Sequence, residues 1–257
     1  MASPEIELID VSFSFDEQPL LQNVSLSLPK GEVFVIMGPS GSGKSTLLKL
    51  MAGIYTPDQG VVKIEGEDLQ KVKEGRRIKM VQRMGMLFQK NALFDSLTVF
   101  ENVAFPLREV KALSEKEIHQ RAEEFLDRVG LLKEKNLYPD EISGGMQKRL
   151  GIARALALDP EIVFYDDPTA GLDPVTSRKI IAMILELQKE KGSTVVAVTN
   201  DVHRAQQLAH RMGFMFGGQL IITGNFEQTL KCQDPRVHQF ITGEVRGPLS
   251  EGVYDTV

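Results

Sequence analysis

A glycine-rich segment between an apolar run and a helix-like run carries the strongest chemical signal in the chain. Residues 38–45 match the pattern G-x-x-x-x-G-K-[ST], and Thr46 adds a second consecutive hydroxyl. Glycines in such a loop let consecutive backbone N–H groups approach phosphate oxygens, and the following helix presents its positive end to the same anion. We expect Lys44 to neutralise phosphate charge and the Ser45 hydroxyl to ligate Mg²⁺. The predicted nucleotide-binding residues are Gly38, Pro39, Ser40, Gly41, Ser42, Gly43, Lys44, Ser45 and Thr46.

A second signal is an acidic residue at the end of a later apolar run. Asp166 follows four apolar residues at 162–165. A nucleotide held by a phosphate loop needs such an acid, at the end of a neighbouring strand, to hold Mg²⁺ from the other side. The long separation between Lys44 and Asp166 implies a large insertion, and helical patterns between about residues 90 and 160 fill it.

A third signal is a Ser-Gly-Gly run that precedes another helix-like pattern. Backbone N–H groups at the start of a helix form an anion site. Ser143, Gly144 and Gly145 are therefore a second candidate phosphate-facing motif. Two such motifs in one chain indicate a nucleotide that is shared between two subunits.

The strands that must position these residues are visible in the hydrophobic pattern. Polar and apolar residues alternate at 5–8 and 25–28, which predicts half-exposed antiparallel strands. Continuous apolar runs at 33–37, 162–165 and 195–198 predict strands of a parallel sheet that is covered on both faces. The phosphate loop follows the first of these runs, and the acidic residue follows the second.

Helical signals dominate the middle of the chain. Ser114 and Glu117 form a capping box at the start of an amphipathic pattern. No internal repeat or low-complexity linker divides the sequence. We therefore expect one α/β domain at 5–240, with an antiparallel β subdomain and a helical subdomain at about 90–160, followed by a C-terminal tail at 241–257.

Composition and charge exclude several classes of protein. The chain has 257 residues, 30 Lys and Arg against 35 Asp and Glu, 42% hydrophobic residues and one cysteine. These proportions are typical of globular proteins and exclude a disordered chain or a disulfide scaffold. A net charge of −5, without a long basic block, argues against nucleic-acid binding.

No segment has the length of a membrane-spanning helix. The uncharged stretch from Met212 to Phe226 has 15 residues, short of the roughly 18–20 that a bilayer requires. The first residues are acidic where a targeting peptide is basic. The lone Cys232 fits a reducing compartment. We expect a cytoplasmic protein whose link to any membrane is made by a partner.

Taken together, the phosphate loop, Asp166 and the Ser-Gly-Gly run resemble the ATP-binding subunits of ABC transporters over about residues 5–230. The resemblance implies a P-loop NTPase with a RecA-like mixed sheet, which binds ATP and Mg²⁺ and works as a dimer of ATPase subunits. Phe15 stands where the family stacks an aromatic ring on adenine. Gln89 matches the glutamine that reaches Mg²⁺ and the attacking water.

Two further motifs are assigned by the same resemblance. Ser143, Gly144 and Gly145 match the signature motif, which contacts the γ-phosphate bound to the opposite subunit. Asp173 ends the run Ala-Gly-Leu-Asp and matches the D-loop, which crosses the dimer interface.

The sequence departs from the family pattern at two catalytic positions. Asp167 stands where a glutamate polarises the attacking water, and its side chain is one methylene shorter. Asn200 stands at the position of the switch histidine; it is able to donate a hydrogen bond but not to become cationic. His203 lies off the motif position, and we expect it on the surface. We expect ATP binding to be intact and hydrolysis to be slow.

Several segments narrow the resemblance to one subfamily. Residues 87–94, 101–108, 234–240 and 247–249, together with Met146, resemble the ATPase subunits of Mla-type phospholipid transporters, which work with Mce-domain proteins. The resemblance implies an integral membrane permease and an Mce-domain substrate-binding protein as partners. It also implies a peripheral location on the cytoplasmic face of the inner membrane.

The segment after Gln89 receives the permease in this resemblance. We expect Pro106 to end a helical turn and to present Phe105 and Leu107 on the docking surface, although apolar residues here also suit the core of a helical subdomain. The basic run at 71–83 suits a solvated helix face better than a lipid-headgroup site.

Other functions share most of these motifs. An importer ATPase for a polar solute such as an amino acid differs only in the subfamily segments. A degenerate ATP-binding regulatory subunit would account for both catalytic departures. Tandem ABC proteins that act on ribosomes or DNA carry a second cassette or a coiled-coil insert, and neither is present. A heterodimer with one intact site also remains open, as do the substrate and the direction of transport.

Overall fold

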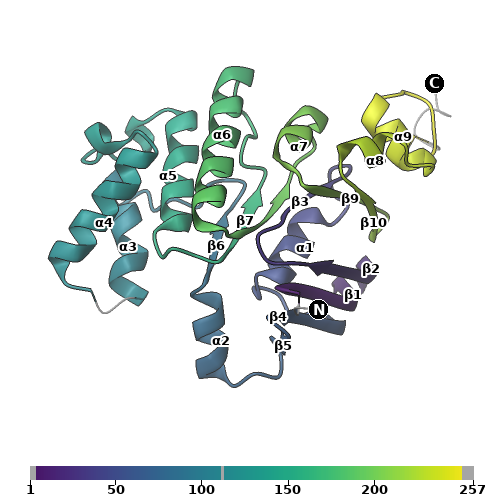
Figure 1. Cartoon of the computed structure of the whole chain (residues 1–257), viewed down its shortest axis with the longest axis horizontal. Helices are drawn as coiled ribbons and strands as arrows, with labels where there is room; N and C mark the ends of the chain where they lie inside the picture. Colours follow the sequence, from purple (N-terminus) through teal and green to yellow (C-terminus); the bar gives the residue numbers. More distant parts are fainter. Residues whose placement is uncertain (1–3, 111–112, 251–257) are drawn as a thin grey trace. The chain divides into compact units, whose positions relative to one another are not determined.

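The computed structural model describes residues 4–110 and 113–250, and Figure 1 shows their helices and strands. These residues divide into two compact units. The first unit combines the chain up to Gln70 with the chain from Val198 onward. The second unit is the intervening segment from Lys71 to Ala197.

The first unit contains an antiparallel sheet in the strand order β2-β1-β4-β5. Its strands are β1 (Ile6–Phe15), β2 (Gln18–Leu28), β4 (Gln59–Ile64) and β5 (Glu67–Asp68). Buried and exposed positions alternate along β1 and β2, with Leu8 opposite Leu26 on the buried side. This arrangement confirms the half-exposed antiparallel strands expected from the alternating pattern.

A second sheet of the first unit carries the phosphate loop. Strand β3 (Val33–Met37) is buried along its whole length and runs parallel to β9 (Arg211–Phe216), which pairs with the antiparallel β10 (Gln219–Gly224). The continuous apolar run thus forms a covered strand, as predicted. The helices of this unit are α1 (Lys44–Met51), α7 (Val202–Leu208), α8 (Phe226–Leu230) and α9 (Pro235–Thr242).

In the second unit, three strands lie in the order β8-β7-β6. Strand β7 (Ile162–Asp166) is fully buried and parallel to β6 (Met84–Leu87); β8 (Thr194–Val198) is also buried, and its last residue falls in the first unit. The helices of this unit are α2 (Glu74–Val81), α3 (Val99–Val110), α4 (Glu115–Arg128), α5 (Gly144–Leu156), α6 (Pro174–Lys191) and the short 3₁₀ helices η1 (Leu132–Glu134) and η2 (Pro139–Glu141).

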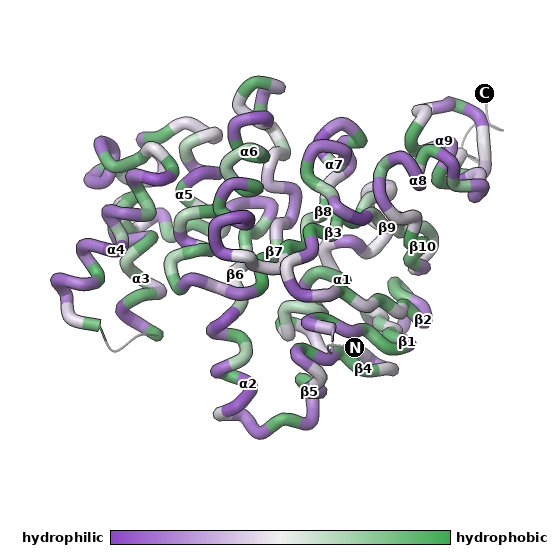
Figure 2. The backbone as a smooth tube through the Cα atoms, in the orientation of Figure 1, coloured by the Kyte–Doolittle hydropathy of each residue, from purple (hydrophilic) through white to green (hydrophobic). Residues whose placement is uncertain are grey.

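Helices α3, α4 and α5 pack side by side (Figure 1). The predicted capping box forms at the start of α4: the Ser114 hydroxyl accepts from the Glu117 N–H, and the Glu117 carboxylate accepts from the Ser114 N–H. Hydrophilic and hydrophobic stretches alternate along α4 in Figure 2, because its buried face includes Ile118, Phe125 and Leu126.

Pro106 corrects one prediction from the sequence. It does not end a helical turn, because α3 continues through it to Val110. A proline inside a helix costs about 3 kcal/mol, and burial of the neighbouring Val103, Ala104 and Leu107 outweighs that cost. Leu107 is therefore a core residue, whereas Phe105 is 38% exposed.

Two expectations about the surface are confirmed. His203 is exposed on α7. The basic run at 71–83 covers α2, whose side chains are exposed apart from the buried Met80. Within the residues that the structure describes, no helix is both long and apolar enough to cross a membrane.

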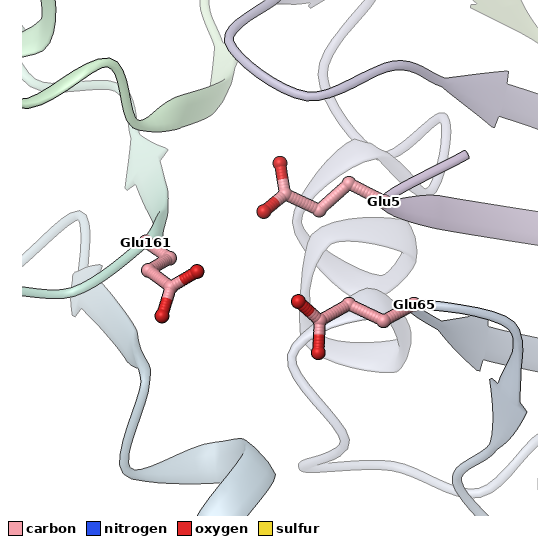
Figure 3. Close-up of side chains that lie close together, drawn as sticks. All are labelled: Glu5, Glu65 and Glu161. Carbon is pink, nitrogen blue, oxygen red and sulfur yellow. The ribbon is translucent and has the colours of Figure 1, made fainter. Parts of the chain in front are cut away.

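Figure 3 draws three glutamates at strand ends. Glu5 precedes β1, is 3% exposed and lies 4.0 Å from the Lys30 ammonium. The N–H of Glu65, just after β4, donates to the Glu5 carbonyl oxygen at 2.8 Å. In the second unit, Glu161 precedes β7 and accepts two hydrogen bonds from Arg83, at 2.7 and 2.8 Å.

Candidate nucleotide site

The phosphate loop connects β3 to α1 and has a backbone that only glycine fits at two positions. Gly38 has φ +140°, and a Cβ there would lie 2.3 Å from the Met215 carbonyl oxygen. Gly43 precedes α1 with φ +97°, and its Cβ would lie 2.7 Å from the Leu21 side chain. Lys44, Ser45 and Thr46 form the first turn of α1. The glycines thus create the close backbone approach that phosphate binding requires.

Two polar side chains of the loop fit an anion. Lys44 is 7% exposed, and its ammonium donates to the carbonyl oxygens of Gly38 at 2.9 Å and of Pro39 at 2.6 Å. The Ser42 hydroxyl is buried and has no hydrogen-bond partner among the described residues. Because buried polar groups are almost always paired, the free hydroxyl points to a ligand held in this loop.

Asn200 reaches the phosphate loop within the first unit. Its side-chain nitrogen lies 3.5 Å from the Ser40 hydroxyl, at the outer limit of a hydrogen bond. The preceding residue fixes this placement, because the Thr199 N–H donates to the Ile36 carbonyl oxygen of β3 at 3.2 Å. The amide therefore stands beside the loop that would hold the phosphates.

Phe15 ends β1 and is 47% exposed. It packs edge-to-face against Phe13 and Tyr55, with ring centroids 4.9 and 5.8 Å away. Lys49 of α1 stands over the Tyr55 ring at 5.5 Å. The ring therefore lies in an exposed aromatic cluster next to the helix that follows the phosphate loop, and it is not a core residue.

Three predicted site residues, the Mg²⁺ ligand Asp166 and the catalytic residues Asp167 and Gln89, lie at or just after the ends of adjacent strands in the second unit. Asp166 is the last residue of β7, is 5% exposed and is followed by Asp167. Gln89 follows β6, whose Leu87 is in register with Tyr165 of β7. Asp167 has φ +49°, a left-handed conformation that is uncommon for residues other than glycine and is often found at functional sites.

Lys148 is a residue at this site to which sequence reasoning assigned no role. It lies on α5, is 4% exposed and donates from its ammonium to the carbonyl oxygens of Gln89 at 2.7 Å and of Asp167 at 3.4 Å. Burial lowers the pKa of Lys148, and the negative charges of Asp167 and Asp166 oppose that shift. The only feature of the sequence that could have pointed to Lys148 is its position five residues after Ser143.

The signature and D-loop motifs line one groove in the second unit. Ser143 caps α5, and its hydroxyl accepts from the Met146 N–H at 3.3 Å. Asp173 caps α6 and accepts from the N–H groups of Val175 at 2.9 Å and Thr176 at 3.0 Å. Hydrogen bonds from the Thr176 hydroxyl and N–H lower the pKa of Asp173. Gly144 and Gly145 form the first turn of α5 in the same groove.

Comparisons with known proteins agree with this set of motifs. The family model of ABC transporters matches residues 21–170. The chain is 38% identical over 244 residues to the intermembrane phospholipid transport system ATP-binding protein MlaF of Escherichia coli K12, covering 95% of this chain and 91% of that protein. It is also 38% identical to the probable ribonucleotide transport ATP-binding protein mkl of Mycobacterium tuberculosis H37Rv, covering 95% of this chain and 68% of that protein.

Solved structures show the same fold. A dimeric ATP-binding cassette in a post-hydrolysis state, bound to ADP and phosphate, superposes with a TM-score of 0.77 at 36% identity, covering 84% of this chain and 96% of that chain. The structure of cbiO1 of Clostridium perfringens, part of the ABC transporter complex cbiONQ, superposes with a TM-score of 0.80 at 28% identity, covering 89% of this chain and 91% of that chain. These findings confirm the expected P-loop NTPase fold and the activity of an ATP-hydrolysing enzyme. The chain belongs to the ABC transporter family and is one of its ATP-binding ATPase cassettes.

Proposed function

We propose that this ATPase drives phospholipid transport in a membrane complex of the Mla type. The observation that carries the proposal is full-length similarity: the chain covers 91% of the Escherichia coli phospholipid transport relative and 92% of the Haemophilus influenzae one, at 38% and 39% identity. The ribonucleotide transport relative is equally identical, but the chain covers only 68% of its length. That difference favours the phospholipid system.

ATP binds, in this proposal, to the phosphate loop of the first unit. Lys44 and the Ser42 hydroxyl contact phosphate oxygens, Phe15 stacks on adenine and Asn200 donates to the γ-phosphate. Ser45, Gln89 and Asp166 offer a hydroxyl, an amide and a carboxylate oxygen, which is the donor set that Mg²⁺ prefers. When bound, Mg²⁺ supplies positive charge that neutralises the phosphate oxygens.

Hydrolysis is assigned to residues at the strand ends of the second unit. Asp167 polarises the attacking water, and Gln89 orients it. A misplacement of about 1 Å costs on the order of 10²-fold in rate, so the shorter Asp167 side chain makes the reaction slow. Asn200 lacks the positive charge of a histidine and adds to this effect.

A second cassette completes the nucleotide site. Ser143, Gly144 and Gly145 offer backbone N–H groups and a hydroxyl at the start of α5, next to Asp173. We assign this groove to the nucleotide of a partner cassette, as the dimeric state of the structural relative suggests. The subunit composition of the purified complex distinguishes a homodimer of this chain from a heterodimer with a homologous chain.

The permease docks on the segment after Gln89. Phe94 and Phe105 are 41% and 38% exposed and lie 4.8 Å apart between ring centroids. The buried Asn102 side chain holds this segment: it accepts from the Phe94 N–H and donates to the carbonyl oxygens of Phe94, Leu97 and Thr98. An exposed aromatic pair, with Phe94 on a fixed loop and Phe105 on α3, suits a protein interface. The chain is thereby peripheral on the cytoplasmic face of the membrane.

The test is purification of the complex from detergent-solubilised membranes through a tag on this chain. We expect an integral membrane permease and an Mce-domain protein to co-purify, and the reconstituted complex to move a fluorescent phospholipid between vesicles when MgATP is added. A Lys44→Ala complex is the inactive control. Co-purification of a permease without an Mce-domain protein, with uptake of a polar solute, would contradict the proposal and support the importer alternative.

A further inference from the structure

Lys148 links three parts of the catalytic machinery inside the second unit. It lies on α5, the helix that begins at the signature serine Ser143. Its ammonium donates to main-chain oxygens of Gln89 and Asp167, at 2.7 and 3.4 Å. Both contacts are made to backbone, so neither depends on the rotamer of the catalytic side chain.

The environment of Lys148 makes these contacts specific. The side chain is 4% exposed, and a buried ammonium needs acceptors to offset its loss of water. Two carbonyl oxygens supply them, and hydrogen bonds to charged groups are about twice as strong as neutral ones. A flexible side chain is thus held in one geometry between two segments that are 78 residues apart in sequence.

Asp167 needs such an anchor. Its φ of +49° places it in a conformation that costs on the order of 1–3 kcal/mol and persists only where surrounding contacts fix it. Its carbonyl oxygen accepts from the Ala170 N–H at 3.2 Å and from Lys148. The Ala170 contact is local, whereas Lys148 ties the strained residue to α5.

We propose that Lys148 is a positioning residue, which sets the placement of Gln89 and Asp167 for attack on ATP and couples it to the signature helix. The inference rests on the roles given to Gln89 and Asp167 under the proposed function. Lys148 compensates for the short Asp167 side chain by fixing the backbone from which that side chain extends. A shift of α5 moves both catalytic residues together.

Substitution of Lys148 separates positioning from stability. Lys148→Met removes the donors while keeping an unbranched side chain, and Lys148→Arg keeps donors. In single-turnover hydrolysis of MgATP by the full chain, we expect Lys148→Met to lower the rate by tenfold to 100-fold and to change the KM for ATP by less than threefold. We expect Lys148→Arg to lose less than fivefold. Lys116→Met, on the exposed face of α4, is the matched control and keeps the original rate.

A double-mutant cycle tests whether Lys148 acts through Asp167. We expect Lys148→Met to lower the rate by less in an Asp167→Asn background than in the original chain, because its effect through Asp167 is already lost there and only the contact to Gln89 remains. If Asp167→Asn slows hydrolysis but Lys148→Met only lowers Tm, or if the two losses multiply, the positioning role is overturned and the proposed role of Asp167 stands. If Asp167→Asn leaves the rate unchanged, the proposed role of Asp167 fails, and the inference fails with it.

Discussion

The phosphate loop and the catalytic strand ends are built in different ways. In the loop, every predicted contact residue lies within nine consecutive positions, and Lys44 folds back onto Gly38 and Pro39. At the strand ends of the second unit, Gln89, Lys148 and Asp167 come from three distant segments. The residues of a local site can be recognised from their spacing in the sequence, whereas the residues of an assembled site are brought together by tertiary contacts.

The largest expected effect is at the loop. A Cβ at Gly38 would meet the Met215 carbonyl oxygen at 2.3 Å, so Gly38→Ala must displace β3 or β9 and the N–H groups beside them. We expect Gly38→Ala to weaken ATP binding by more than about 100-fold, measured by titration with a fluorescent ATP analogue.

Gly192→Ala is the control for that substitution. Gly192 also has a positive φ, +65°, but a Cβ there meets nothing within 4 Å, and the residue is the C-cap of α6 in the second unit. We expect it to cost about 1–2 kcal/mol of stability, because an L-residue is strained in this left-handed conformation, with unchanged ATP affinity. Equal losses of ATP affinity in both variants would show that ATP binding does not specifically require glycine at position 38.

A smaller effect is expected at the assembled site. The double substitution Asp167→Glu with Asn200→His restores the residues that the family pattern places there, and we expect it to raise the rate of hydrolysis about tenfold to 100-fold. Phosphate release in single-turnover experiments measures it, with Asn200→His alone as the comparison. No gain from the double variant would mean that the local backbone, including Asp167 at φ +49°, already compensates.

The smallest effect concerns the cap of α6. The pKa of Asp173 is lowered by the Thr176 hydrogen bonds, so its charged form stabilises the folded chain at neutral pH. This contribution is present above the unfolded pKa of about 3.9 and is lost as the pH falls through the lower folded value. We expect Asp173→Asn to lower Tm by no more than about 2 °C at pH 7.

The pH dependence of the Tm difference tests whether the charge of Asp173 stabilises the helix end. The Tm difference between Asp173→Asn and the original chain should shrink below pH 4. A difference that is constant between pH 7 and pH 3 would contradict the charged cap. A Tm change at pH 7 far larger than expected would indicate that Asp173 supports more than one helix end.

The contrast between the two sites also explains which features of the structure could be predicted from the sequence. The strands at 33–37 and 162–166 were readable because a buried parallel strand imposes a continuous apolar run. Pro106 misled because its local penalty is smaller than the burial of the helix around it. Lys148 and the backbone of Asp167 left no local pattern, since their partners are distant or main-chain atoms. Motif order supplied the candidate residues, but only tertiary contacts placed Lys148 among them.

Asn102 has a consequence for the kinetics of assembly. Its side chain already makes hydrogen bonds to main-chain groups of Phe94, Leu97 and Thr98. The loop therefore loses its conformational entropy when the chain folds, and it loses no more when a partner binds. Under the proposed docking of the permease on this segment, encounter is then limited by orientation, at association rates of about 10⁵–10⁷ M⁻¹s⁻¹. Without the Asn102 amide, the loop would lose this conformational entropy only on binding. Complex formation would then be slower, although the cassette would still fold.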